Sequence, residues 1–436
     1  MNSKALMGGF ALVAAAYIGV AFGSSFYAEK RYHETLQEVN DSLAQTSPDI
    51  RITDITYSRG LFDSTGRFVV EWNFRNSFMR QNLLGELPAD FKGSTVRFIV
   101  DNQIRTGPWL GSKGFGLARI HSVANYDPQT VPEVLIQAFN GQNMVTSEVS
   151  IGYLKAVSFD IYGAPFAIED EGENVDFRGF RAQLSSNFWN KKGDFTFNMP
   201  YLGIVSDFGA SQFLIHNLTY TTQDAEHDNF MLWSISGRHE STLGQLKFVV
   251  NQIHLIELNQ YHMVSDGKIT RDVLAFDSQT SFKGIYQGYP FEGHINGQAE
   301  GIDVNFYKMI GEGLENVNEE DFKSFIMHAP FTKGTGQLTI NGQIMNMHVS
   351  AGIRSSSPEE LNMPAGMLIL SKMYANLNVE IPPSFLTPGL IGHDAYQTVA
   401  MMIQERILVR QSNNTYASDI SMEGGRITVN GHERRF

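Results

Sequence analysis

Two stretches of the chain carry residue types that bind metal ions or phosphate in other proteins. The acidic run Glu169–Asp176 has enough carboxylates to attract Ca²⁺, but it lacks the alternating ligand positions and the twelfth-position Glu of an EF-hand loop. A solvated loop is the preferred interpretation of this run. The glycine-rich segment Gly111–Gly116 does not have the spacing of a phosphate-binding loop. Neither stretch predicts a binding site.

Histidines gather in another region without forming a catalytic pattern. Their spacings match no zinc motif, so we interpret them as surface or strand residues: His227, His239, His254 and His262. The acidic segment Asn318–Asp321 is explained by carboxylates at the positive end of a helix dipole. The esterase motif G-x-S-x-G and the zinc motif H-E-x-x-H do not occur. The sequence predicts no catalytic residue, no metal site and no cofactor.

The overall composition excludes several classes of protein. The chain of 436 residues has no cysteine, which rules out disulfides, thiolate metal sites and cysteine nucleophiles. Its 46 acidic and 33 basic residues give a net charge of −13, which argues against a nucleic-acid partner. The 31 phenylalanines and 40 glycines favour a sheet-rich fold with many turns.

Residues 1–28 form the first predicted segment. No charged residue occurs between Lys4 and Glu29, and the apolar part extends as far as Phe22. This part is longer than the apolar region of a secretory signal, and a helix over it would span the hydrocarbon core of a bilayer. The sequence therefore predicts a single-pass transmembrane anchor, with a cleaved signal ending near Gly23 as the alternative. The short basic N-terminal tail favours a body outside the cytoplasm.

Small residues recur every four positions in this segment, at Ala11, Ala15, Gly19 and Gly23. Such a stripe lets two membrane helices approach closely, which would produce a homodimer. The alternative is that Ala and Gly are simply common in this short span.

Residues 29–48 are predicted to form a membrane-proximal helix. Its apolar stripe is spaced four, three and four residues apart, and it consists of Tyr32, Leu36, Val39 and Leu43. Ser47 and Pro48 end the helix. The stripe would either pack on the body of the protein or continue the helix pair.

The body, residues 49–436, has the period-two pattern of half-buried strands. Phe68, Val70, Trp72 and Phe74 alternate with polar residues, and later runs repeat this pattern. Asn-Gly pairs are the strongest short hairpin signal, so antiparallel pairing is expected around Asn296-Gly297, Asn341-Gly342 and Asn430-Gly431. Helices are predicted over 303–315, 319–328, 395–410 and 130–139. The body is expected to divide into two halves near 167–176.

The predicted fold is mainly β with a few helices, in which an N-terminal transmembrane helix precedes an elongated antiparallel multi-stranded assembly. Around twenty strands exceed what one open sheet usually holds, so the sheet must curl into a trough or split into packed sheets. A trough would offer an apolar groove for a lipid or another hydrophobic ligand. A closed sandwich would use the same apolar faces as its core.

Three motifs resemble elements of a known family. The element Y-x-R-G-x-F-x-S, which opens the bacterial YdgA-like family, is matched by Tyr57, Arg59, Gly60, Phe62 and Ser64. The later H-G-P signature is matched at Gly107 and Pro108, with Arg105-Thr106 where a His usually precedes the Gly-Pro. The segment Gly424–Gly431 resembles the closing strand and turn of the family. More distantly, the chain is similar to envelope proteins related to AsmA.

The resemblance implies a protein of the bacterial inner membrane with its body in the periplasm and with no established activity. Gly60, Gly107 and Pro108 would set turn geometry, and Arg59 would pair with a carboxylate or cap a strand end, with ligand binding as the alternative. The leading hypothesis is a non-enzymatic protein that binds a hydrophobic molecule or a partner protein. A purely structural component of an envelope complex and an envelope hydrolase are the alternatives.

Overall fold

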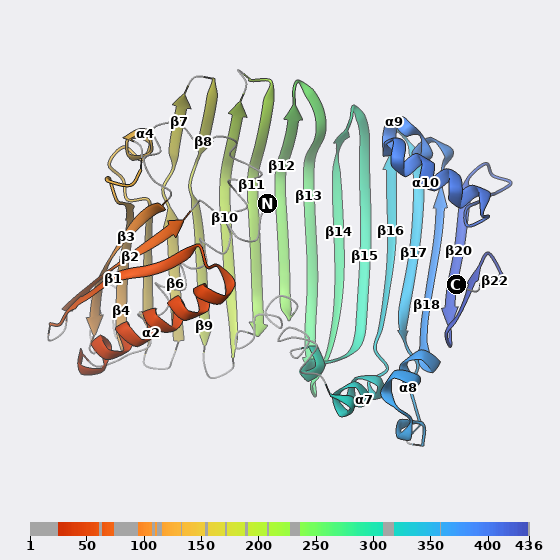
Figure 1. The fold of residues 1–436 in the computed structure, drawn as a ribbon, viewed down its shortest axis with the longest axis horizontal. Coiled ribbons are helices and arrows are strands. Elements are labelled where there is room, and N and C mark those ends of the chain that lie inside the picture. Colours follow the sequence, from red (N-terminus) through yellow and green to blue (C-terminus); the bar gives the residue numbers. More distant parts are fainter. Residues whose placement is uncertain are drawn as a thin grey trace. The chain divides into compact units, whose positions relative to one another are not determined.

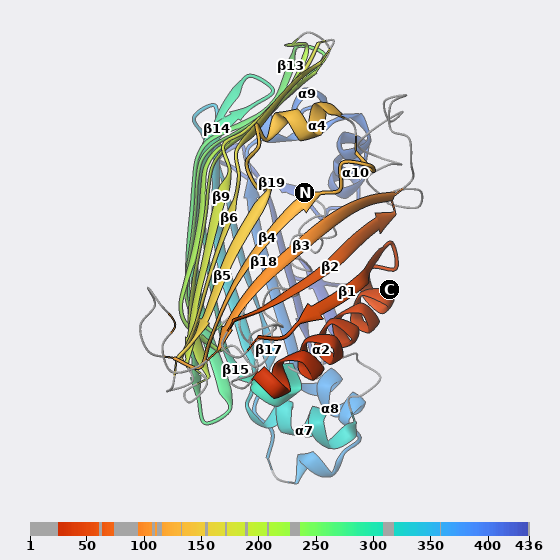
Figure 2. The same cartoon turned by 90° about the vertical axis from the view of Figure 1, so that its left-hand side faces the viewer.

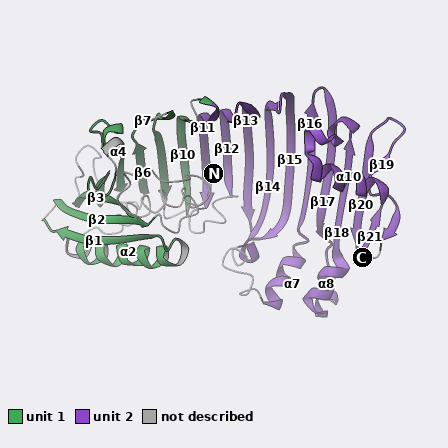
Figure 3. Ribbon diagram, turned by 45° about the horizontal axis from the view of Figure 1, so that its top comes forward, with its two compact units in different colours: residues 1–209 green, residues 210–436 purple. Residues whose placement is uncertain are grey.

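The structure of the protein is a computed structural model that divides into two compact units, Met1–Gly209 and Ala210–Phe436 (Figure 3). The residues that it describes are 25–60, 63–73, 95–106, 110, 116–131, 133–152, 156–170, 172–187, 191–206, 209–226, 236–307, 318–357 and 359–434. Antiparallel strands dominate both units (Figure 1). The predicted fold of mainly strands with a few helices is confirmed. In the predicted dividing region, 167–176, residues 167–170 and 173–176 lie in two paired strands of the first unit.

The sheet of the first unit is a succession of antiparallel pairs. Its main strands, in spatial order, are β1 (Ile50–Ser58), β2 (Asp63–Asn73), β3 (Thr95–Thr106), β4 (Ala118–Tyr126), β5 (Val145–Ile151), β6 (Ala156–Gly163), β9 (Phe180–Asn187) and β10 (Lys192–Ser206). The hairpin of β7 (Phe166–Asp170) and β8 (Glu173–Phe177) pairs with the second half of β10. The short helix α4 (Glu133–Ala138) precedes β5.

Helix α2 (Ser25–Thr46) covers one face of this sheet (Figure 2). Its stripe residues Tyr32, Leu36 and Leu43 are buried in one cluster with apolar side chains from β2, β3, β4 and β6, such as Phe68. The alternation of each strand places its apolar residues on the face that meets the helix. The predicted helix is therefore confirmed, and its stripe packs on the body.

The second unit is a meander in which each strand pairs with the next one along the chain. Its strands are β11 (Ser211–Glu226), β12 (Gly237–Val250), β13 (Ile253–Thr270), β14 (Val273–Tyr286), β15 (Tyr289–Asp303), β16 (Phe331–Ile340), β17 (Gln343–Ile353) and β18 (Met373–Ile381). Strand β20 (Tyr416–Glu423) pairs with β18, and β19 (Val409–Arg410) and β21 (Arg426–Val429) pair with β20. Strand β22 (His432–Arg434) pairs with β21.

Two-residue turns connect many of these strands. Asn341-Gly342 joins β16 to β17, and Asn430-Gly431 joins β21 to β22, with positive φ at all four residues. These two hairpin predictions are confirmed, because this turn type requires positive φ at both central residues. The third prediction is wrong: Asn296 and Gly297 lie inside β15 and pair with both β14 and β16.

The helices of the second unit lie between strands. Those that lie wholly within the described residues are α7 (Glu319–Met327), α8 (Ala365–Lys372), α9 (Pro388–Ile391) and α10 (His393–Gln404), with short 3₁₀ turns η5 (Glu360–Asn362) and η6 (Pro383–Leu386). Asn318 and Asp321 form a capping box at the start of α7. The prediction that this acidic segment begins a helix is therefore confirmed. The helix predicted over 395–410 ends earlier, because residues 409–410 pair with β20.

The N-terminal transmembrane helix is the part of the predicted fold that must be corrected. Within the described ranges, no helix is both long and apolar enough to cross a membrane. Helix α2, the first described element, is amphipathic and packs on the sheet. Residues 1–24, with most of the predicted anchor and its small residues Ala11, Ala15, Gly19 and Gly23, lie outside the described residues.

Candidate functional site

The motif around Tyr57 connects helix α2 to the sheet of the first unit. The ring of Tyr57 lies 5.3 Å from the ring of Tyr32, and Arg59 Nη2 lies 3.1 Å from Glu29 Oε2 in α2. A side chain at Gly60 would collide with the carbonyl of Asp63, so the turn there requires glycine. These contacts support a structural role for the motif. Phe62, Gly107 and Pro108 lie outside the described residues.

A short chain of hydrogen bonds is buried beneath helix α2. Asn102 Nδ2 donates to Tyr32 Oη at 2.9 Å, and Ser122 Oγ donates to Asn102 Oδ1 at 2.6 Å. All three residues are buried. Burial raises the pKa of Tyr32 well above its usual value, so its hydroxyl stays neutral. The chain fixes the position of the helix on the sheet.

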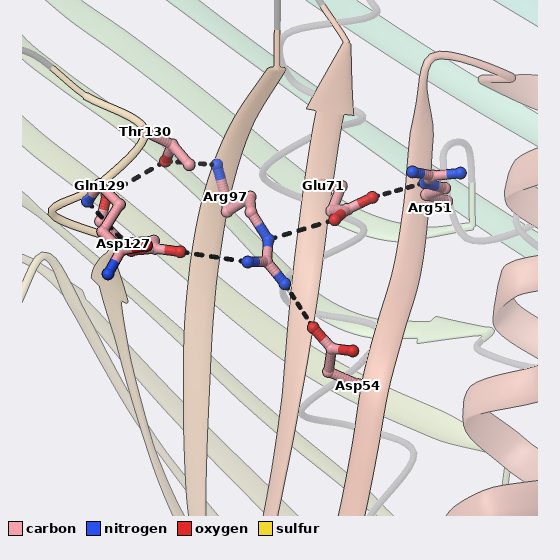
Figure 4. Close-up of polar contacts among 7 residues, drawn as sticks. All are labelled: Arg51, Asp54, Glu71, Arg97, Asp127, Gln129 and Thr130. Carbon is pink, nitrogen blue, oxygen red and sulfur yellow. Dashed lines mark hydrogen bonds and ion pairs between the residues drawn. The ribbon is translucent and has the colours of Figure 1, made fainter. Parts of the chain in front are cut away.

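The outer face of the same strands carries a network of charges (Figure 4). Arg51 in β1, Glu71 in β2 and Arg97 in β3 form one row of opposed residues. Arg97 also pairs with Asp54 and with Asp127, where Nη1 and Oδ2 are 3.4 Å apart. The β-bulge at Asp54, which has a positive φ, presents this carboxylate to Arg97. Since both arginines are already paired with carboxylates, this network holds strands together and offers little to a ligand.

The histidines do not form a cluster. His227 lies outside the described residues, and His254 and His262 lie at different positions of β13. Buried His239 accepts a hydrogen bond from Tyr220 at Nδ1 and donates from Nε2 to the carbonyl of Ser236. Its pKa is lowered, mainly by burial. In the part of the chain that the structure describes, no group of His, Asp and Glu side chains is arranged to hold a metal ion.

The sheet of the second unit has two faces of opposite character. Directly opposed residues in an antiparallel pair place their side chains on the same face. Residues that are opposed from strand to strand form a row across the sheet. Ile295 and Met347 lie in one row, and Asn296 and His348 lie in the next row, so these two rows are on opposite faces. The cross-strand hydrogen bond from Asn296 to Thr335 agrees with this assignment.

We call the first of these the apolar face, and it extends from β12 to β18. It consists of Leu243, Tyr261, Met263, Phe282, Ile295, Leu338, Met345, Met347, Val349, Leu377 and Val379. Each of these side chains is half-buried or exposed, and Ile295 is 45% exposed. The three rows that contain them have no Asp, Glu, Lys or Arg between β12 and β18. This is the candidate functional site.

Glycines on the apolar face leave room for large side chains from neighbouring strands. A Cβ at Gly293 would lie 2.2 Å from the ring of Phe282, so that ring lies directly over the glycine. In the same way Val349 lies beside Gly334, where a Cβ would be 3.2 Å from Cγ1. Large side chains can therefore lie flat on the sheet and form a smooth surface.

One end of the apolar face is closed by helices. Ile326 of α7, Leu368 of α8 and Ile353 of β17 form a buried cluster there. The helices α9 and α10 lie near the opposite ends of strands β16 to β18 (Figure 1). The middle of the face contributes none of its residues to the buried clusters of the described chain.

The opposite face carries a polar groove of about 410 Å³. Its side chains form two rows that cross β14 to β18, namely Gln279, Asn296, Thr335, His348 and Asn378, and Asp277, Gln298, Lys333, Ser350 and Asn376. This groove was not predicted from the sequence. Its signal was the recurrence of amide and hydroxyl residues at every second position of consecutive strands.

The fold and these surfaces define a mainly β protein with two antiparallel units and an open apolar sheet face. Residues 2–318 match the family DUF945, described as a bacterial protein of unknown function, and the chain belongs to this family. Neither a curated protein nor a solved structure gives a significant match. The finer resemblances to YdgA-like proteins and to AsmA-related proteins stay predictions.

Proposed function

We propose that this protein is a non-enzymatic binding protein of the bacterial periplasm whose apolar face holds a hydrophobic molecule, such as the acyl chain of a lipid. The observation that carries the proposal is that apolar side chains recur on one face of seven consecutive strands and that none of them is fully buried. Water contact with so large an apolar surface is unfavourable, and monomeric proteins rarely leave such surfaces without a partner.

The dimensions and chemistry of the face suit an extended chain. Seven strands from β12 to β18, spaced about 4.8 Å apart, give a path of roughly 29 Å across the sheet. Each methylene group removed from water along this path contributes about 0.8 kcal/mol. Met263, Met345 and Met347 are unbranched and polarizable, so they adapt to chains of different shape. The absence of formal charge in these rows favours an acyl chain over a charged ligand.

The test measures binding of a fluorescent polyene fatty acid to the full-length protein. Ile295→Glu and Met347→Glu place a carboxylate on the apolar face, where burial against the ligand without a partner is costly. We expect each to weaken binding at least tenfold. Gln337→Glu is the matched control, because it adds the same charge to the opposite face of the neighbouring strand.

Three results would reject the proposal. The wild-type protein could fail to bind the fatty acid and could be free of lipid in native mass spectrometry. Gln337→Glu could weaken binding as much as the two changes on the apolar face. Fatty-acid binding could also survive both Ile295→Glu and Met347→Glu.

The periplasmic location rests on the sequence resemblance and has its own test. We expect a fusion of alkaline phosphatase to the C-terminus to be active, because that enzyme folds in the periplasm. An inactive fusion that accumulates in the cytoplasm would reject this location.

A further inference from the structure

The polar groove differs in chemistry from every other surface described above. Amides and hydroxyls make up most of its walls, and Asp277 and Lys333 are the carboxylate and the ammonium among its lining residues. Its volume of about 410 Å³ lies within the range of small-molecule sites. The groove lies on strands β14 to β18, on the face opposite the apolar face.

The amides of the groove retain capacity for further hydrogen bonds. Asn296 Nδ2 donates to Thr335 Oγ1 at 3.5 Å, and Asn376 Nδ2 donates to Ser350 Oγ at 3.3 Å. These distances are long, so both bonds are weak. An asparagine has two N–H donors and a carbonyl oxygen that accepts. Each of these amides can therefore give one donor and one acceptor to a ligand without losing its contact within the sheet.

The groove repeats this chemistry at regular intervals. Side chains in each row are spaced by the distance between strands, about 4.8 Å. Successive rings of an extended, β-linked sugar chain repeat at close to this interval, and each ring carries several hydroxyl groups. A ligand that lies across the strands would thus meet a donor and an acceptor at each step.

We infer that the polar groove is a second binding site, for an uncharged, hydroxyl-rich chain such as an oligosaccharide. An anion is disfavoured because Asp277 stands in the same row as Lys333 and directly opposite Asp266 of β13. An acyl chain is disfavoured because the two wall rows have no large aliphatic or aromatic side chain apart from the His348 imidazole, and Val349 is the one aliphatic residue among the lining residues. The site is independent of the proposed function, since the sheet separates the two faces.

The experiment titrates the full-length protein with neutral hexasaccharides in an isothermal calorimeter. Cellohexaose, chitohexaose and maltohexaose serve as probes, because they share hydroxyl groups but differ in linkage and substituents. We expect at least one to bind, and the double variant Asn296→Ala/Asn376→Ala to weaken that binding at least tenfold. Ile295→Ala is the control, because it changes the residue next to Asn296 on the other face. Circular dichroism verifies the fold of each variant.

The outcomes separate this site from the apolar face. The double variant should bind the polyene fatty acid like the wild type. If the wild-type protein binds a hexasaccharide but not the fatty acid, the inference about the groove still stands and only the proposed function fails. The inference is overturned if no hexasaccharide binds at millimolar concentration. It is also overturned if the double variant binds like the wild type, or if Ile295→Ala weakens sugar binding equally.

Discussion

Replacing Tyr32 with phenylalanine should loosen helix α2, whereas the same replacement at Tyr57 should not. The Tyr32 hydroxyl accepts a hydrogen bond from Asn102 Nδ2 at 2.9 Å, and both residues are buried. The Tyr57 hydroxyl is also buried, but it has no hydrogen-bond partner among the described residues. The two rings lie 5.3 Å apart and pack in the same cluster. The pair therefore isolates the effect of one hydrogen bond.

The size of the effect follows from the group that is left without a partner. Tyr32→Phe keeps the ring, so it creates little cavity, but it leaves a buried amide N–H of Asn102 unpaired. Such a loss costs about 1–3 kcal/mol. Tyr57→Phe removes a buried hydroxyl that has no bond to lose, so stability should stay the same or rise slightly.

Hydrogen exchange of peptides from residues 25–46, followed by mass spectrometry, measures the free energy of opening of α2. Tyr32→Phe should accelerate exchange by roughly 5- to 150-fold, because each 1.4 kcal/mol changes an equilibrium constant tenfold. Tyr57→Phe should leave the exchange rate near that of the wild type. Equal acceleration in the two variants, or no acceleration in Tyr32→Phe, would refute the assignment of the hydrogen bond as the contact that fixes the helix.

Three other changes test contacts elsewhere in the chain. Gly66→Ala should lower the melting temperature seen by circular dichroism, because the added carbon would lie 2.6 Å from the Tyr32 ring; an unchanged melting temperature would contradict this packing. Arg97→Met should shift the urea midpoint more than Arg67→Met, because Arg97 contacts three carboxylates while Arg67 pairs with one exposed carboxylate. Lowering the pH below the usual histidine value of 6.5 should reduce the protection of β11 and β12 amides against hydrogen exchange, once the slower intrinsic exchange at lower pH has been divided out. Burial lowers the pKa of His239, so the unfolded chain binds this proton more readily than the folded chain. Stability therefore decreases as the pH is lowered. His239→Gln should lose this dependence.

The strands of the second unit could be predicted from alternation, but their turns only in part. Asn341-Gly342 turns because both residues adopt positive φ, whereas Asn296-Gly297 continues β15 because strands on both sides pair with it. The turns at Asn251-Gln252 and Arg271-Asp272 also have positive φ at both residues but contain no glycine. Whether such a residue pair forms a turn or continues a strand depends on the strands that pair beside it, and a local motif does not contain that information.

The candidate site could not be predicted because alternation does not reveal what covers an apolar face. Phe68 in β2 and Phe282 in β14 are both phenylalanines inside antiparallel strands, yet Phe68 is fully buried and Phe282 is not. Helix α2 accounts for the difference, since it packs on the sheet that contains Phe68. A sequence pattern predicts which side chains share a face, and packing alone determines whether that face becomes core or binding surface.

The connections between strands of the second unit determine how its number of strands can change. Strands β11 to β18 each pair with the next strand, and two-residue turns join several of them. Contacts between residues close in sequence give a low contact order, as in repeat proteins, where units can be added without disturbing distant ones. Insertion of one hairpin would widen the apolar face by two strand spacings, about 10 Å. Genetic gain or loss of single hairpins is therefore a simple route by which homologues could match ligands of different length.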